Sequence, residues 1–327
     1  MTLSRTPTPD NNKFKPLYKA HRHLKHEDIP SDPYILDPRR PDYYDLYKVG
    51  QRKLTQLEID QITNASKRYT GSPADNRFFQ DATALTFEDL PGFTVYPNLL
   101  TPDVQSTMIE QIVQDHLPEP RHLSNLTPFY HLPLPFNIFD DSKDPILHKD
   151  STKSSTTMHS IRSKQLRWIT LGGQYNWTSK EYPTFTPGED GFPPFPEPLR
   201  QVLHGMFPSM DPEAAIINFY SPGDILSPHQ DVAEICEADL VSVSIGCDCV
   251  FYVSPSRENT PLAVLLRSGD VVIMGGQSRH AFHGVGRVWG DTCPDYLTTI
   301  TNDKWSQYSQ WLSNKRININ VRQMLPR

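Results

Sequence analysis

The stretch AAIINFYSPGDILSPHQD, residues 214–231, places an apolar run directly before a turn and a His-x-Asp motif. Its first part, residues 214–220, is rich in β-branched and aromatic side chains, which is typical of a buried strand. The Ser-Pro-Gly sequence at residues 221–223 then supplies turn residues. We therefore expect a strand that ends close to His229 and Asp231 and holds these two side chains on a rigid support.

Short runs that are likewise rich in β-branched residues continue toward the C-terminus and are separated by Gly, Pro, Asp and Ser. Besides residues 214–220, the predicted strands are Leu240–Ile245, Val250–Val253, Leu262–Leu266, Val271–Met274 and Arg316–Arg322. Predicted helices cover Leu54–Tyr69, a segment that begins at Thr101-Pro102, and Thr301–Lys315. Helices first and strands second predict an α+β fold, in which a jelly-roll barrel (a double-stranded β-helix) has flanking N-terminal helices.

The composition describes a chain that can bury a core. It has 327 residues, of which 37% are hydrophobic, and a formal net charge of -6. The first fifty residues are rich in proline and charge, and we expect them to be largely extended or irregular over the domain surface. We predict a proline-rich, charged N-terminal extension at residues 1–75 and a domain that carries the functional site at residues 76–327.

Targeting and redox signals are weak. No apolar run of about eighteen residues predicts a membrane span, and the first twelve residues lack the apolar core of a secretory signal. The expected location is the nucleus, the cytoplasm or both, with a mitochondrial location left open. The four cysteines are expected to be reduced thiols, because no export signal is seen. Their spacing does not match a structural zinc site.

Net acidity does not favour nucleic-acid binding, but binding depends on local placement of basic residues. One candidate patch lies near the N-terminus and consists of Lys13, Lys15, Lys19, Arg22 and Lys25. The alternative interpretation of this patch is a solvated, flexible basic tail.

His-x-Asp supplies two of the three side chains with which mononuclear non-haem iron oxygenases hold their metal, a second histidine being the third. The motif occurs at His26, His148 and His229, and only the last follows a predicted strand. His280 and His283 are both available as the third ligand. They would point to opposite faces of a strand, and the residues alone leave the choice open.

The segment Arg316–Arg322 alternates strictly between polar and apolar residues. It fits an edge strand with its polar side in water. It also fits a strand whose polar side faces the barrel and binds a dicarboxylate, since arginine forms paired, charge-assisted hydrogen bonds with carboxylates. In the second interpretation Asn218 and Tyr220, on one face of their own strand, would complete the binding site.

From Leu166 to Leu325 the sequence resembles the AlkB family of Fe(II)- and 2-oxoglutarate-dependent dioxygenases, and within it the AlkB homologue 1 subfamily. The most specific segments are Leu166–Gly172, Tyr175–Trp177 and Arg316–Gln323. The resemblance implies an AlkB-like Fe(II)/2-oxoglutarate dioxygenase domain over residues 76–327. It also favours His283 over His280, because the segment from Ser278 to His283 resembles the family's second-histidine segment.

The resemblance assigns site residues position by position. It implies that the metal, Fe(II), is bound by His229, Asp231 and His283. It implies that 2-oxoglutarate is bound by Asn218, Tyr220, Arg316, Asn318 and Arg322. It places Trp168, Tyr175 and Trp177 in the segment that recognises the substrate nucleotide, where flipped bases stack on aromatic rings. For Trp168 a packing role in the core is an equal alternative.

The resemblance also implies a reaction. With dioxygen and 2-oxoglutarate, such an enzyme oxidatively demethylates or hydroxylates methylated nucleobases in tRNA, DNA or both. One alternative is a 2-oxoglutarate-dependent oxygenase that acts on a protein side chain, for example in a histone, or on a small molecule. Another is a non-catalytic nucleic-acid-binding module. The sequence does not identify the methylated base, the type of nucleic acid or the oligomeric state.

Overall fold

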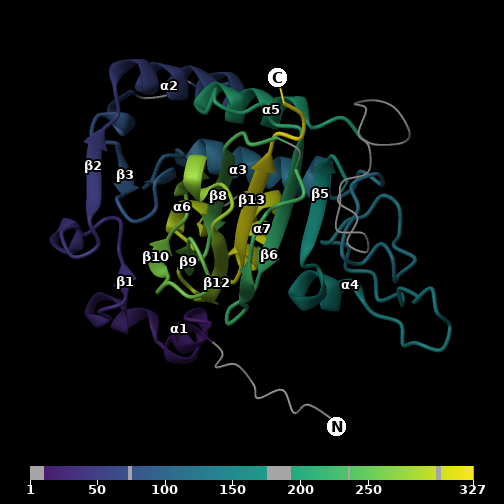
Figure 1. Ribbon diagram of the computed structural model, residues 1–327. Coiled ribbons are helices and arrows are strands. Elements are labelled where there is room, and N and C mark those ends of the chain that lie inside the picture. The colour runs from purple at the N-terminus through teal and green to yellow at the C-terminus, as the bar shows by residue number, and fades with distance from the viewer. Residues whose placement is uncertain (1–10, 73–75, 175–192, 235, 300–302, 327) are drawn as a thin grey trace, which may run out of the picture.

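The computed structural model describes residues 11–72, 76–174, 193–234, 236–299 and 303–326, and its centre is formed by two β-sheets (Figure 1). The smaller sheet contains, in spatial order, β1 (Ile35–Leu36), β10 (Leu262–Leu266), β9 (Cys249–Ser254), β12 (Phe282–Val288) and β7 (Leu226–His229). The larger sheet contains β2 (Val49–Lys53), β3 (Thr83–Phe87), β4 (Phe93–Tyr96), β11 (Val271–Met274), β8 (Leu240–Gly246), β13 (Arg316–Arg322), β6 (Ala214–Tyr220) and β5 (Trp168–Gly172). The strand pairs are antiparallel, apart from the parallel pair β1 and β10.

Helices cover the outer face of the larger sheet. They are α2 (Gln56–Thr70), α3 (Pro102–Gln111), which continues as one wider turn at Ile112–His116, α5 (Glu197–Met206) and α7 (Asp303–Leu312). The short helices α4 (Met158–Ser160) and α6 (Asp295–Thr298) lie in the connections. The four longer helices share one apolar core with the larger sheet, and a second apolar cluster lies between the two sheets. The predicted α+β jelly-roll barrel with flanking helices is confirmed.

Several predicted elements match the structure closely. The strands β6, β10, β11 and β13 have the predicted bounds, whereas β8 and β9 are slightly longer than predicted. Helix α3 begins where expected, and the hydroxyl of Thr101 accepts the backbone N–H of Val104 as a helix cap. These elements were predictable because their apolar spacing is strong and their ends carry cap or turn residues.

The sequence pattern missed β7 and β12, which carry the two histidines of the site. β7 contains Pro228, and β12 contains glycines that weaken any strand signal. At Gly286 the glycine is needed for close packing, since a Cβ there would lie 2.3 Å from the Tyr252 ring. Strands of this kind are specified by their neighbours in the sheet more than by their own residues.

The N-terminal segment is more ordered than expected. Helix α1 (Phe14–His21) buries Phe14 and Leu17 on the outer face of the smaller sheet, and β1 extends that sheet. The side chains of Asp37 and Arg267 join the segment to the barrel through two hydrogen bonds of 2.7 Å. The expectation of largely irregular structure is therefore wrong for these parts, while the domain division at residue 75 stays a prediction. The few apolar residues of the segment pack against residues that are distant in the sequence, and local periodicity cannot predict such contacts.

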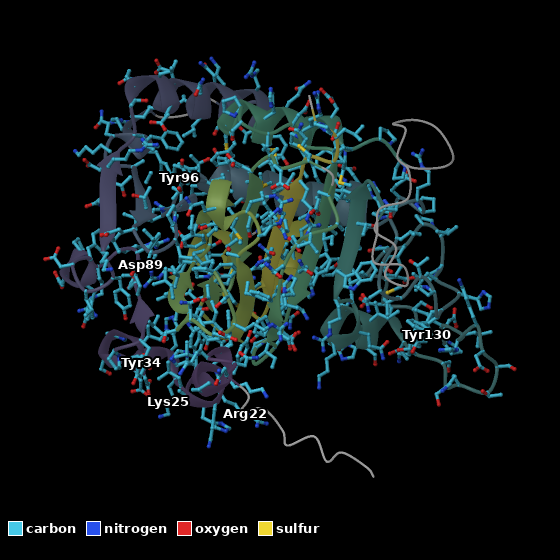
Figure 2. The ribbon with its side chains drawn as sticks, in the orientation of Figure 1. Arg22, Lys25, Tyr34, Asp89, Tyr96 and Tyr130 are labelled. Atoms are coloured by element: carbon cyan, nitrogen blue, oxygen red, sulfur yellow. The ribbon has the colours of Figure 1, made fainter. Side chains whose placement is uncertain are left out.

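The candidate basic patch lies on and beside α1. Its members, Lys13, Lys15, Lys19, Arg22 and Lys25, have exposed side chains. Arg22 and Lys25 lie near the lower edge of the molecule in Figure 2. The opposite face of α1 is buried, so these residues project from a helix that packs on the sheet. No described helix is long and apolar enough to cross a membrane, and the four cysteines are free thiols.

β13 lies at the centre of the larger sheet, between β8 and β6, so the edge-strand interpretation is wrong. Its apolar residues face the helices, and its polar residues face the smaller sheet. The side chains of Arg316 and Arg322 are only 1% and 4% exposed. A buried arginine needs hydrogen-bond and charge partners, so the interior of the barrel must be polar at this face.

The packing of α1 predicts that Phe14→Ala destabilises the whole protein. Phe14 is fully buried, with its ring centroid 6.4 Å from that of Tyr252, and its truncation should lower the free energy of unfolding by about 3 kcal/mol or more. Urea denaturation measures this change. Leu46→Ala, at a side chain that is 69% exposed, is the control. Equal stability of the two variants would mean that residues 14–21 do not contribute to the fold.

Candidate functional site

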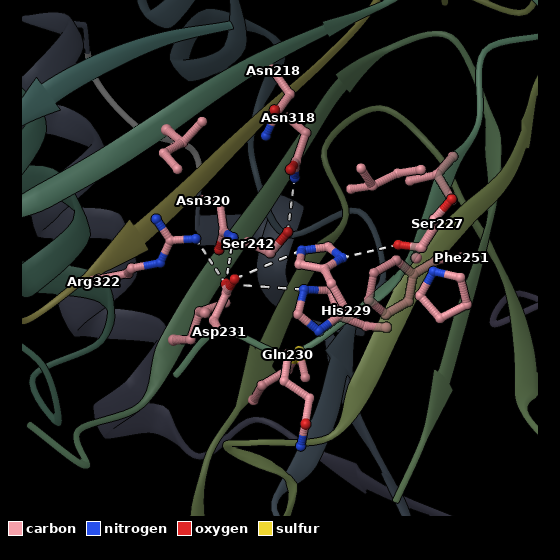
Figure 3. Close-up of a pocket in the computed structure, with 18 of the residues that line it drawn as sticks. Asn218, Ser227, His229, Gln230, Asp231, Ser242, Phe251, Asn318, Asn320 and Arg322 are labelled. Carbon is pink, nitrogen blue, oxygen red and sulfur yellow. Dashed lines mark hydrogen bonds and ion pairs between the residues drawn. The ribbon is translucent and has the colours of Figure 1, made fainter. Parts of the chain in front are cut away.

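A cavity of about 550 Å³ lies between the two sheets. β6, β8 and β13 form one wall, and β7, β12 and residues 230–234 form the other (Figure 3). Both walls carry polar side chains deep in the barrel. Since buried polar groups cost free energy unless they have partners, such a cavity is the expected place for a functional site.

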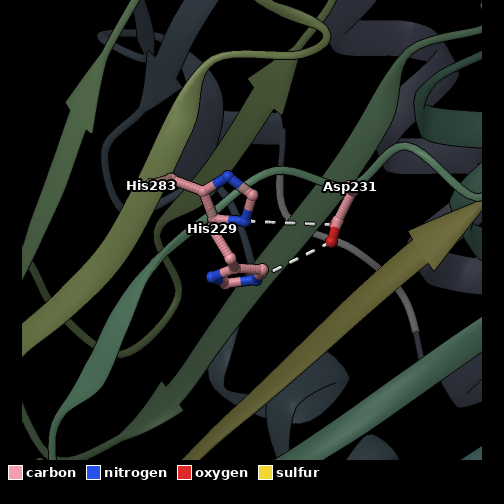
Figure 4. Close-up of side chains that lie close together, drawn as sticks. All are labelled: His229, Asp231 and His283. Atoms are coloured by element: carbon pink, nitrogen blue, oxygen red, sulfur yellow. Dashed lines mark ion pairs between the residues drawn. The ribbon is translucent and has the colours of Figure 1, made fainter. Parts of the chain in front are cut away.

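His229, Asp231 and His283 come together in this cavity (Figure 4). β7 and β12 are neighbours, and His229 lies directly opposite His283 in the register. The Nε2 atoms of His229 and His283 lie 3.7 Å and 3.9 Å from the carboxylate oxygens of Asp231. One nitrogen or oxygen atom from each residue lies within 4.8 Å of the others, which is close enough for all three to bind one metal ion.

The backbone fixes the orientation of both imidazoles. The Nδ1–H of His229 donates to the carbonyl of Ser227, and that of His283 donates to the carbonyl of Ala281, each at 3.1 Å. Both Nε2 atoms therefore carry a lone pair that faces Asp231. Burial, opposed by the Asp231 carboxylate, lowers the pKa of His283 to about 4. His283 is therefore neutral near pH 7, as a metal ligand must be.

Asp231 is held as a carboxylate. Burial by itself raises the pKa of Asp231, but the charge and hydrogen bond of Arg322, together with His283 and His229, outweigh it and hold that pKa well below its usual range. Nη2 of Arg322 donates to Oδ2 of Asp231 at 2.8 Å, and Nδ2 of Asn320 donates to the same oxygen at 3.1 Å (Figure 3). Two imidazoles and one carboxylate on one side of a cavity fit the ligand set of a non-haem Fe(II) oxygenase.

The competing histidines lie outside this group. His280 precedes β12 and pairs with Glu237 at 2.9 Å. His26 pairs with Asp248, and the half-buried His148 accepts the backbone N–H of Asp150. Within the described parts of the chain, the group of His229, Asp231 and His283 is the one set of side chains with metal-ligand geometry.

Arg316 has hydrogen-bond donors without a partner. Its Nη2 donates to the hydroxyl of Ser244 at 2.9 Å, and its guanidinium lies 5.4 Å from the centre of the Tyr220 ring. Its Nε and Nη1 atoms are buried and find no hydrogen-bond partner among the described residues. A carboxylate in the cavity would satisfy both atoms with charge-assisted bonds. This feature fits one end of 2-oxoglutarate.

The residues predicted to bind 2-oxoglutarate all line this cavity: Asn218, Tyr220, Arg316, Asn318 and Arg322. Their roles differ. Asn318 donates to the hydroxyl of Ser242 at 2.8 Å and to the carbonyl of Val243 at 3.0 Å. Arg322 already contacts Asp231 and Glu234. It lies six residues, or roughly 20 Å along a strand, from Arg316. This separation exceeds the length of 2-oxoglutarate. The two carboxylates of one 2-oxoglutarate molecule can therefore reach Arg316 and Arg322 together only if the two arginine side chains converge.

Sequence reasoning missed several polar residues of the site. Asn320 was visible on the polar face of β13 but was not included. Ser242 and Ser244 alternate with valines in β8, which is a usable signal for an inward face. Glu234 carried no signal, although its side chain is 2% exposed and pairs with Arg279 at 3.0 Å. Such a pairing between distant segments cannot be deduced from either segment alone.

The predicted substrate-binding aromatics are not assembled by the described structure. Trp168 lies on β5 opposite Asn218 in the register, but it does not line the cavity. Tyr175 and Trp177 lie outside the described residues. Their role in substrate binding stays a prediction.

Comparisons with known proteins agree with this geometry. Residues 136–322 match the model of the 2OG-Fe(II) oxygenase superfamily. The N6-methyladenosine RNA demethylase ALKB1 of Pyricularia oryzae is 35% identical, over 72% of this chain and 75% of that protein. The tRNA demethylase abh1 of Schizosaccharomyces pombe is 37% identical, over 74% of this chain and 82% of that protein.

A third relative is shorter. The N6-methyladenosine RNA demethylase ALKBH of Cryphonectria parasitica is 39% identical, over 64% of this chain and 96% of that protein. The family match and the identities agree with the ligand set in the cavity. The chain therefore belongs to the 2OG-Fe(II) oxygenase superfamily, as a dioxygenase of the AlkB homologue 1 subfamily that uses Fe(II) and 2-oxoglutarate.

Proposed function

We propose that this dioxygenase oxidises methyl groups on the nucleobases of RNA or DNA. The observation that carries the proposal is a single cavity that combines a His-Asp-His group with the unsatisfied donors of Arg316. Relatives that cover most of the chain are named as RNA and tRNA demethylases, which supports nucleobases as the substrate class. The alternative substrate is a protein side chain or a small molecule, and an experiment must distinguish it from a nucleobase.

His229, Asp231 and His283 are the proposed iron ligands. When bound there, the iron supplies the activation of dioxygen that is coupled to the conversion of 2-oxoglutarate into succinate and carbon dioxide. The hydrogen bonds to the carbonyls of Ser227 and Ala281 keep both Nε2 lone pairs directed at the metal position. These bonds fix the tautomer and raise the basicity of each ligand.

Arg316 is the proposed anchor of 2-oxoglutarate. Its Nε and Nη1 atoms would donate to the carboxylate that lies away from the metal. Ser244 and the ring of Tyr220 hold the guanidinium in place before the cosubstrate binds. A pre-positioned arginine loses little side-chain entropy on binding, and that favours affinity.

Arg322 has a positioning role beside the iron. It contacts Asp231 through Nη2 at 2.8 Å and Glu234 through Nε at 3.0 Å. Arg279 completes the group through Glu234, so two arginines balance two carboxylates. The balance holds Asp231 in one orientation and keeps it ionised in a buried place.

The chemistry of the substrate decides the product. Oxidation replaces one C–H bond of the methyl group by C–OH, with the second oxygen atom of dioxygen going to succinate. A hydroxymethyl group on nitrogen then releases formaldehyde and leaves N–H, which is demethylation. A hydroxymethyl group on carbon stays attached, which is hydroxylation.

Removal of the anchor should weaken cosubstrate binding selectively. Arg316→Gln deletes a buried charge-assisted contact, so the KM for 2-oxoglutarate should rise about 30-fold or more, while iron still binds. Steady-state succinate formation and an iron titration measure the two effects. Arg121→Gln, at a side chain that is 52% exposed, is the control. An unchanged KM in Arg316→Gln would exclude Arg316 as the anchor.

The proposed function predicts that methylated nucleic acid stimulates turnover. Succinate and formaldehyde should form with methylated tRNA or methylated single-stranded DNA, and much less with a methylated peptide or no substrate. His229→Ala should lower this turnover at least ~100-fold, because it removes a metal ligand. His148→Ala, at a His-x-Asp motif outside the cavity, should keep it. Stimulation by the peptide alone would overturn the nucleobase proposal.

A further inference from the structure

A second cavity, of about 500 Å³, has a lining that shares no residue with the cavity of the iron site. It is enclosed by the wide helical turn Ile161–Gln165, by α7 and by the turn that follows β6. Lys315 lines this cavity, whereas the next residue, Arg316, lines the first. Consecutive residues of an extended chain point to opposite sides. The backbone at these two residues therefore separates the two cavities, which have different lining residues.

Lys315 is a buried ammonium group without a carboxylate partner. It is 4% exposed, and its Nζ donates to the carbonyl of Ser163 at 2.7 Å and to the hydroxyl of Ser221 at 2.6 Å. Both acceptors are uncharged, and no carboxylate forms an ion pair with Lys315 in the described structure. Burial lowers the pKa of Lys315 to about 8. A buried cation normally has an anionic partner.

The nearby carboxylates are already engaged. Asp224 pairs with Arg167 at 3.1 Å and accepts the backbone N–H of Ser221. Asp141 pairs with Arg162 at 3.5 Å. Lys315 and the exposed Lys164 form no ion pair with a carboxylate among the described residues that line the cavity, although the charge of Asp224, outside the lining, opposes the effect of burial on the pKa of Lys315. This surplus of positive charge favours an anionic ligand.

The rest of the lining suits a nucleotide. Phe139 and Trp311 contribute aromatic rings whose centroids lie 5.8 Å apart, and the guanidinium of Arg162 lies over the Phe139 ring at 5.6 Å. The side-chain amides of Gln307 and Gln310 from α7, and of Asn314 from the turn after it, complete the lining. Basic groups next to aromatic rings and amides are the usual features of single-stranded nucleic-acid sites.

We propose that this second cavity binds one nucleotide of a single-stranded nucleic acid, with its phosphate at Lys315, Lys164 and Arg162 and its base against Phe139 and Trp311. The volume lies in the range of small-ligand sites. The inference rests on the proposed function, because it takes the same polymer as the substrate of the iron site. Lys315 lies at the far end of β13 from Arg322, roughly 20 Å away, so only a strand of several nucleotides reaches both cavities.

The test compares a long and a short substrate. Lys164→Glu reverses an exposed charge, and Lys315→Met removes the buried one. In both variants the KM for a methylated single strand of about 20 nucleotides should rise about tenfold, with kcat unchanged. The KM for a methylated strand of about three nucleotides, which spans only ~10 Å, should not change. Lys53→Glu, on the opposite edge strand β2 of the larger sheet, is the control for net charge.

Fluorescence anisotropy with an unmethylated strand of about 20 nucleotides separates this inference from the proposed function, because binding needs no turnover. Weaker binding by Lys164→Glu than by Lys53→Glu supports the second site even if no substrate is oxidised. Equal binding by the two variants overturns it. If Lys315→Met proves unstable, Lys164→Glu decides. Binding of adenosine monophosphate in the cavity, without any effect of the variants on the long strand, also contradicts the proposal.

Discussion

The ion pair between Arg322 and Asp231 joins the two sheets of the barrel at the metal position. Arg322 belongs to β13 of the larger sheet, and Asp231 is the second residue after β7 of the smaller one. Burial alone raises the pKa of Asp231, and the guanidinium is the first of the groups that oppose this effect and keep Asp231 a carboxylate that can bind a metal. Burying two charges is costly, and the surrounding pairs of Glu234 with both Arg322 and Arg279 offset that cost.

β13 serves the core and the site at the same time. Ile317, Ile319 and Val321 are fully buried against the helices, while the intervening polar residues face the cavity. A slip of one residue in the register would exchange the two faces and bury arginines in an apolar core. The register against β6 and β8 is continuous along the strand. The strict alternation of the sequence therefore fixes both the packing and the position of Arg316.

Much of the barrel and the centre of the site followed from the sequence, for identifiable reasons. The strands β6 and β13 carry strong patterns, and the His-x-Asp motif at His229 follows one of them closely. The inward face of β13 was left open by the residues, because alternation alone does not distinguish an edge strand from a central one. The buried partners Glu234 and Arg279 were not predictable, since their pairing depends on the tertiary fold. Neither was the packing of α1, whose apolar residues are few.

Coupling between metal and cosubstrate tests the central claim most directly. If the His-Asp-His group and Arg316 form one site, 2-oxoglutarate contacts the metal and the protein together. Calorimetric titration under anaerobic conditions should then show that Fe(II) raises the affinity for 2-oxoglutarate about tenfold or more, and that 2-oxoglutarate raises the affinity for Fe(II) by the same factor. Equal affinity with and without Fe(II) would contradict the account, because it would place the two ligands in separate sites.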